Sequence, residues 1–260
     1  MPAAGRVSAS SRSPRQGKQM TENLLGKRWE LFVFDWDGTV MDTTYLIARA
    51  MQQACKALGY PEPELSLARS TIGLGEDDTM RIICPQCPRS RFGEFLVAYK
   101  NWYIPREEEI SVFDGLEAML TGMHRAGLRL AIATGKSAAG MERVFRKTGL
   151  GPLFESVKTA DRSWPKPNPA MLLELADETG VETSRMVMVG DAIHDMLMAR
   201  NAGAAGVGVT FGGGSPEALR EGRPHAIVST VPELARVLGV MPEMNAELRR
   251  RGLTEISEQP

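Results

Sequence analysis

Residues 31–39 read Leu-Phe-Val-Phe-Asp-Trp-Asp-Gly-Thr, and this stretch decides the fold. The four apolar residues at its start are typical of a short strand that is buried on both faces. Two acids, Asp35 and Asp37, follow this apolar run at once. The stretch therefore predicts a buried strand whose carboxyl end carries a pair of carboxylates.

Beyond residue 111, segments with strand character alternate with segments of helical spacing. The expected strands span residues 128–133, 186–189, 205–209 and 226–228. The expected helices span residues 116–126, 138–148, 169–179, 193–202 and 231–238. This alternation predicts an α/β fold, a doubly wound parallel sheet with helices covering both faces.

Residues 43–111 separate the first strand from the others and show no strand pattern of their own. Apolar residues recur at helical spacing from Thr43 to Gly59, and two prolines, Pro61 and Pro63, end that helix. The separation is far longer than an ordinary crossover between neighbouring strands. We therefore expect a helical domain at residues 43–111, inserted into a core that is formed by residues 29–42 and 112–240.

Both ends of the chain are polar. Residues 1–28 are rich in Ser, Arg and Lys and lack the apolar run of a secretory signal, so a disordered basic tail is expected. An organellar transit peptide shares this composition and stays open as an alternative. Residues 241–260 are expected to form a polar tail, in which the run Arg249–Arg251 faces solvent.

Composition excludes several classes of protein. Hydrophobic residues make up 43% of the 260 residues and charged residues 24%, which is ordinary for a packed protein. The formal net charge of -1 gives no reason to expect a nucleic acid as partner, and no apolar run is long enough to cross a membrane. Three cysteines cannot form a disulfide framework, so we expect a cytoplasmic protein.

Four polar clusters fall where expected strands end or helices begin. They are Asp35–Thr39, Thr134–Lys136, Lys166–Pro169 and Gly190–Asp195. Ligands of such sheets bind at the carboxyl ends of the strands. One Asp after a strand is usually a helix cap, but carboxylates gathered from two strand ends repel each other unless a cation lies between them. Oxygen ligands suit Mg²⁺, and a nearby lysine and threonine hydroxyl suit a phosphoryl group.

The four clusters, in this order, resemble the motifs of the haloacid dehalogenase (HAD) superfamily of hydrolases. Asp35–Thr39 resembles its first motif, DxDG followed by Thr or Val, and Gly190–Asp195 resembles its fourth, GDxxxD. Thr134 and Lys166 resemble the threonine or serine of the second motif and the lysine of the third.

The insert at residues 43–111 is similar to the type 1 helical cap of that superfamily, and we call these residues the cap. Two further stretches, Ser70–Gly75 and Gly212–Leu219, are similar to phosphoglycolate-phosphatase-like members. The resemblance covers about residues 29–240 and implies a Rossmann-like HAD core.

The resemblance also implies a role for each motif residue. Asp35 would be the nucleophile, and Asp37 would protonate the leaving oxygen and then deprotonate the attacking water. The cofactor would be Mg²⁺, held by the side chains of Asp35 and Asp191 and the backbone carbonyl of Asp37. Asp195 would orient a metal-bound water or the lysine. The remaining expected substrate-binding residues are Thr134, Gly135, Lys136 and Lys166.

The activity that this resemblance implies is the Mg²⁺-dependent hydrolysis of a small phosphomonoester, such as phosphoglycolate, through an aspartyl-phosphate. A phosphomutase of the β-phosphoglucomutase kind would share all four motifs and stays open as an alternative. A non-enzymatic phospho-signalling receiver is an alternative from another class. We expect a small phosphorylated metabolite as the partner, neither nucleic acid nor membrane, and a monomer or homodimer.

Four other features are expected to be structural. Trp36 points away from the two acids if the pleat of the strand continues, which favours packing. Cys84 and Cys87 lack the further ligands of a zinc site and are expected in a loop of the cap. His194 is expected to pack or cap at the start of a helix, and Glu76–Asp78 to begin another helix.

Overall fold

The computed structural model describes residues 29–257, which form a six-stranded sheet in the order β3-β2-β1-β4-β5-β6. All neighbouring strands are parallel. The predicted doubly wound parallel sheet is therefore confirmed. The strands are β1 (Leu31–Phe34), β2 (Arg129–Thr134), β3 (Ser156–Thr159), β4 (Met186–Gly190), β5 (Ala205–Val209) and β6 (Ala226–Val228).

Helices cover both faces of the sheet because each central strand is apolar on both sides. In β1, Leu31 and Val33 pack against α7 (Ala170–Thr179) and α8 (Ile193–Ala202). Phe32 and Phe34 belong to the other face. That face is covered by α5 (Leu116–Arg125), α6 (Ala138–Thr148), α10 (Val231–Leu238) and α11 (Met241–Arg250), while α9 (Pro216–Glu221) packs beside α8.

The edge strand β3 was not predicted from the sequence. Its residues, Ser-Val-Lys-Thr, include only one apolar side chain, and three of the four are half-buried. Lys158 lies on this strand and pairs with Glu174 and Glu178 of α7. An edge strand needs an apolar pattern on one side only, so its pattern is too short to stand out.

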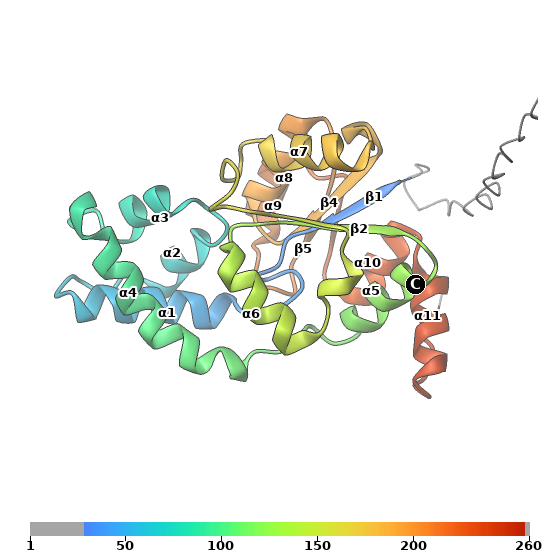
Figure 1. The fold of residues 1–260 in the computed structure, drawn as a ribbon, viewed down its shortest axis with the longest axis horizontal. Coiled ribbons are helices and arrows are strands. Elements are labelled where there is room, and N and C mark those ends of the chain that lie inside the picture. The colour runs from blue at the N-terminus through green and yellow to red at the C-terminus, as the bar shows by residue number, and fades with distance from the viewer. Residues whose placement is uncertain (1–28, 258–260) are drawn as a thin grey trace, which may run out of the picture.

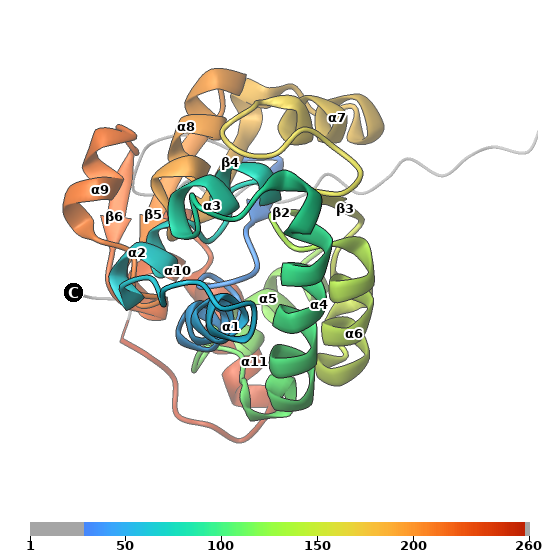
Figure 2. The same cartoon turned by 90° about the vertical axis from the view of Figure 1, so that its left-hand side faces the viewer.

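The cap consists of helices and lies beyond the carboxyl end of β1 (Figure 1). Its main helices are α1 (Thr44–Ala57), α2 (Leu65–Ser70), α3 (Glu76–Ile83) and α4 (Phe92–Tyr103), with short 3-10 helices η1 (Arg89–Arg91) and η2 (Ile104–Glu109). In both views α4 runs beside α6 of the core (Figures 1 and 2). Two further short 3-10 helices, η3 (Gly151–Leu153) and η4 (Thr183–Arg185), belong to the core.

The two chain segments that join the cap to the core lie side by side. Met41 forms an antiparallel bridge with Val112, and the amide of Asp42 donates to the carbonyl of Ser111 at 3.0 Å. A pair of adjacent short connections suits a hinge between the cap and the core.

The C-terminal segment differs from the polar tail that its composition predicted. Residues 241–250 form α11, which packs against α5. Its buried apolar residues are Met241, Met244 and Leu248, at helical spacing, and the buried Glu247 pairs with Arg125 and Arg251. Three apolar residues among many charges give a weak pattern, which explains why the packing of this segment on the core was not predicted. The predicted basic tail at residues 1–28 lies outside the described residues.

Within residues 29–257, no helix is both long enough and apolar enough to span a membrane.

Candidate active site

Three acids from two neighbouring strand ends meet at the carboxyl edge of the sheet. Asp35 follows β1, Asp191 follows β4, and Asp195 lies in the first turn of α8. One carboxylate oxygen from each of the three lies within 4.8 Å of the others. All three side chains are buried. The structure thus brings the first and fourth sequence clusters together.

The chain turns sharply after the second acid. Gly38 has a φ of +81°, which favours glycine, and a Cβ atom there would lie 2.2 Å from Asp191 Oδ2. The loop after β5 packs closely against the same turn, since a Cβ on Gly212 would lie 1.7 Å from the Gly38 carbonyl oxygen. Trp36 points into the core, where its ring meets Phe145 edge to face at 5.4 Å, so its predicted packing role is confirmed.

Lys166 joins the acids from the loop before α7. Its ammonium lies 2.7 Å from Asp35 Oδ1 and donates a hydrogen bond of 2.6 Å to Asp195 Oδ1. The second oxygen of Asp195 accepts the Ala192 amide at 3.1 Å. Asp195 is therefore held from both sides, and its place in turn determines where the Lys166 ammonium lies.

The second sequence cluster closes the site from β2. Thr134 is fully buried, and its Oγ1 accepts the Lys136 amide at 3.1 Å, which leaves its own hydroxyl hydrogen free to donate. Lys136 Nζ donates to both oxygens of Asp37, at 2.9 and 3.1 Å. The structure thus gathers every residue that the sequence proposed for the site.

The three clustered carboxylates carry more negative charge than the single ammonium of Lys166 can balance. Burial raises the pKa of Asp35 from 3.8 to about 7, opposed by Lys166 and aided by Asp195 and Asp37. Burial, followed by the charges of Asp35 and Asp195, raises the pKa of Asp191 well above its usual value. Burial alone would lower the pKa of Lys166, but the carboxylates of Asp195 and Asp35 outweigh it and raise that pKa.

This donor set fits a divalent cation. Three carboxylates share one ammonium, and Asp191 has no ion-pair partner among residues 29–257. Buried carboxylates in this state are stabilised by a cation, and a set made of oxygen atoms alone suits Mg²⁺. Asp195 is less suited to bind the ion directly, because both of its oxygens already accept hydrogen bonds.

The cap closes over these residues. Gly73, in the loop between α2 and α3, lies so near the core that a Cβ on Gly135 would approach its Cα to 2.9 Å. Arg69 of α2 donates to Thr44 Oγ1 at 3.0 Å and to the Gly212 carbonyl at 3.4 Å. Glu76–Asp78 form the first turn of α3, as predicted.

Sequence reasoning missed two cap residues at this interface. Arg69 could have been suspected, because it directly precedes the glycine-containing cap loop. Tyr103, at the end of α4, carries no signal in the sequence, and its ring centroid lies 5.5 Å from Lys136 Nζ.

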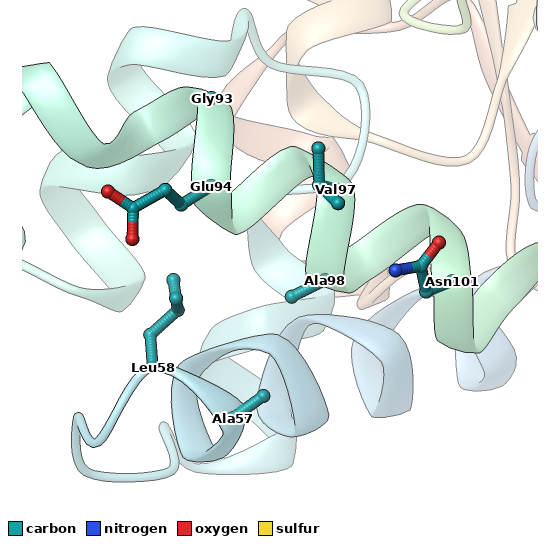
Figure 3. A pocket seen from close by; sticks show the side chains of 7 residues that line it. All are labelled: Ala57, Leu58, Gly93, Glu94, Val97, Ala98 and Asn101. Atoms are coloured by element: carbon teal, nitrogen blue, oxygen red, sulfur yellow. The ribbon is translucent and has the colours of Figure 1, made fainter.

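The cap also contains a pocket and three cysteines, which lie apart from the clustered acids. A pocket of about 450 Å³ opens between the end of α1 and α4, and none of the four sequence clusters lines it (Figure 3). The cysteines of the cap, Cys55, Cys84 and Cys87, are buried, and they form no disulfide. Burial raises the pKa of the Cys55 thiol to about 12, so this thiol is poorly reactive.

Comparison with known proteins identifies the family of the chain. The profile of a family described as haloacid dehalogenase-like hydrolase matches residues 32–209. A phosphoglycolate phosphatase from Vibrio parahaemolyticus is 31% identical over 221 residues, 81% of this chain and 96% of that protein. A probable phosphatase, IndB, from Dickeya dadantii is 32% identical over 78% of this chain and 91% of that protein.

Solved structures show the same fold. A putative haloacid dehalogenase-like hydrolase from Bacteroides fragilis has a TM-score of 0.72 at 21% identity, covering 79% of this chain and 99% of that one. The chain belongs to the haloacid dehalogenase-like hydrolase family. It is an enzyme of that family, of the phosphatase class.

Proposed function

We propose that the enzyme hydrolyses a small phosphomonoester of the phosphoglycolate type, with Asp35 carrying the phosphoryl group between two displacements. The observation that carries this proposal is the setting of Asp35. Its buried carboxylate lies 2.7 Å from the Lys166 ammonium, beside acids that suit a divalent cation, and Asp37 follows two residues later.

In the first displacement, an Asp35 oxygen forms a bond to phosphorus as the ester P–O bond breaks. Asp37 delivers a proton to the leaving oxygen, which departs as an alcohol. In the second displacement, water attacks the phosphorus of the aspartyl-phosphate, and Asp37 takes its proton. The Asp35–phosphorus bond breaks, so inorganic phosphate is released and Asp35 is restored.

The other residues of the site would hold the phosphoryl group during both displacements. The free hydroxyl hydrogen of Thr134, the Gly135 amide and the Lys166 ammonium are donors that suit its oxygens. Lys136 would bind another part of the substrate, since its ammonium now pairs with Asp37 at the same edge of the sheet. Asp195 acts through Lys166, which it orients by the 2.6 Å hydrogen bond.

Asp35, Asp191 and the backbone carbonyl of Asp37 would hold Mg²⁺. When bound, Mg²⁺ supplies positive charge that balances the phosphoryl oxygens and the clustered carboxylates. The residues of the chain supply the nucleophile of the first displacement, bind the substrate and move one proton in each displacement.

The closed cap supports a small substrate. Gly73 and Arg69 bring the cap into contact with the β2 and β5 ends of the core, which leaves little room for a phosphoprotein. We also keep the cytoplasmic location as a prediction.

The test is a panel of small phosphorylated metabolites, with released phosphate and isomerised product measured in parallel. Release of phosphate in the presence of Mg²⁺ is the expected result. Isomer formation without phosphate release would favour the phosphomutase. Absence of both reactions, with a folded protein, would refute the proposal that the substrate is a small phosphomonoester.

A further inference from the structure

The ammonium of Lys136 occupies the position from which Asp37 would act. Nζ lies 2.9 Å from one oxygen of Asp37 and 3.1 Å from the other, so it faces the carboxylate head on. The two side chains are only 8% and 10% exposed. A leaving oxygen that takes its proton from Asp37 must approach these same carboxylate oxygens. Lys136 must therefore move to another anion before Asp37 can reach the substrate.

Tyr103, whose ring lies beside the Lys136 ammonium, offers a second hydrogen-bond donor. Tyr103 of the cap is 2% exposed, and its hydroxyl has no hydrogen-bond partner among residues 29–257. The ring of Tyr103 lies 5.5 Å from Lys136 Nζ and stacks on Tyr99 at 5.4 Å. Buried hydroxyls without a partner are costly, so this one is poised to meet an acceptor from a ligand.

Lys136 is tied to the residues proposed to bind the phosphoryl group. The Lys136 amide donates to Thr134 Oγ1, so the backbone that carries the ammonium is tied to the proposed phosphoryl site. An anion that reaches Lys136 while its phosphoryl group contacts Thr134 must therefore be joined to that group by a short link. Its charge must also replace a single carboxylate as the partner of a single ammonium.

From these contacts we infer that Lys136 and Tyr103 bind a carboxylate of the substrate, and that this carboxylate draws Lys136 away from Asp37. The inference rests on the proposed function. It restricts the substrates to phosphomonoesters of short 2-hydroxy acids. A phosphomonoester that lacks the carboxylate leaves Lys136 on Asp37 and is turned over slowly.

The experiment compares 2-phosphoglycolate with ethyl phosphate, in which a methyl group stands in place of the carboxylate. The ratio of their kcat/KM values is measured for the wild type and for Lys136→Met, Lys136→Arg and Tyr103→Phe. Lys158→Met is the matched control, because it also removes a lysine paired with carboxylates but lies on the edge strand β3.

The wild type should prefer 2-phosphoglycolate by roughly 100-fold or more, since a site built around a polar group rejects the analogue that lacks it. Lys136→Met should lower the ratio about 10- to 100-fold, and Tyr103→Phe about 2- to 10-fold. Lys136→Arg keeps the charge and should lower the ratio less than Lys136→Met. Lys158→Met should leave the ratio unchanged.

Two results would overturn the inference while leaving the phosphatase function intact. One is a wild type with no preference for the carboxylate. The other is an unchanged ratio in Lys136→Met, and an equal loss on both substrates in that variant would mean that Lys136 only supports Asp37. If Lys136→Met fails to fold, an unchanged ratio in Tyr103→Phe would be decisive against it. A folded wild type that is inactive on every small phosphomonoester would instead refute the proposed function.

Discussion

Asp195→Asn should both destabilise the protein and slow its turnover. The substitution keeps the volume of the side chain but leaves it only one oxygen acceptor. Asp195 now accepts hydrogen bonds on both oxygens, from Lys166 at 2.6 Å and from the Ala192 amide at 3.1 Å. An asparagine can satisfy one of these donors and must present its NH₂ group to the other.

The size of the effect follows from the burial of this group. Asp195 and Lys166 are almost completely buried, so the lost hydrogen bond is a charged one in a site without water. Such a bond contributes about 1.5–3 kcal/mol to the free energy of unfolding. Relief of the repulsion among Asp35, Asp191 and Asp195 offsets part of this loss but leaves Lys166 with one fewer partner. The midpoint of thermal unfolding should fall by about 3–10 °C.

The assay is thermal unfolding in EDTA, followed by kcat with Mg²⁺ on the best substrate. Glu178→Gln is the matched control, because it removes the charge from a lysine–carboxylate pair at the surface, where Glu178 is 52% exposed. That change should cost less than about 1 kcal/mol and leave kcat unaltered. An Asp195→Asn protein that unfolds at the wild-type temperature, or that keeps full kcat, would refute the positioning role of Asp195.

Three further predictions concern the acids. Gly38→Ala should abolish activity, because the new Cβ would collide with Asp191. Gly127→Ala is the control, because Gly127 has a similar φ of +77° but nothing within 4 Å of the new Cβ, so this variant should lose only stability. Activity assays and melting curves on both variants test this prediction. In the absence of metal, the raised pKa of Asp35 means that the folded state binds the extra proton, so its contribution to stability is full below about pH 4 and is lost as the pH rises toward 7. The unfolding free energy of the wild type should therefore fall relative to that of Asp35→Asn as the pH rises from about 4 toward 7 in EDTA, and parallel curves would exclude the effect. Asp37→Asn should slow the hydrolysis of alkyl phosphates far more than that of nitrophenyl phosphate, whose leaving group needs no proton, and equal losses would exclude an acid role.

The fold was predictable where a strand or helix has a strong pattern of its own. The run Leu31–Phe34 is apolar throughout because both of its faces are covered, and this makes the central strand visible in the sequence. The edge strand β3 and the helix α11 each have one partly apolar side, so neighbouring charges conceal them.

The acids of the site were predictable for a different reason. Parallel strands place their carboxyl ends at one edge, so Asp35 and Asp191 had to meet once β1 and β4 were recognised. The partners of Lys136 could not be predicted in the same way. Its contact with Asp37 depends on the conformation of a long side chain, and its contact with Tyr103 depends on how the cap is seated on the core; no local pattern in the sequence records either one.

The most direct test of the central claim is the stereochemical course at phosphorus. A phosphomonoester whose phosphoryl group is made chiral with sulfur and oxygen isotopes is hydrolysed in isotopically labelled water, and the configuration of the released thiophosphate is determined. Each in-line displacement inverts the configuration, so transfer to Asp35 followed by transfer to water predicts net retention. This readout does not depend on how much aspartyl-phosphate accumulates. Net inversion would mean that water attacks the substrate directly and would contradict the role of Asp35 as nucleophile.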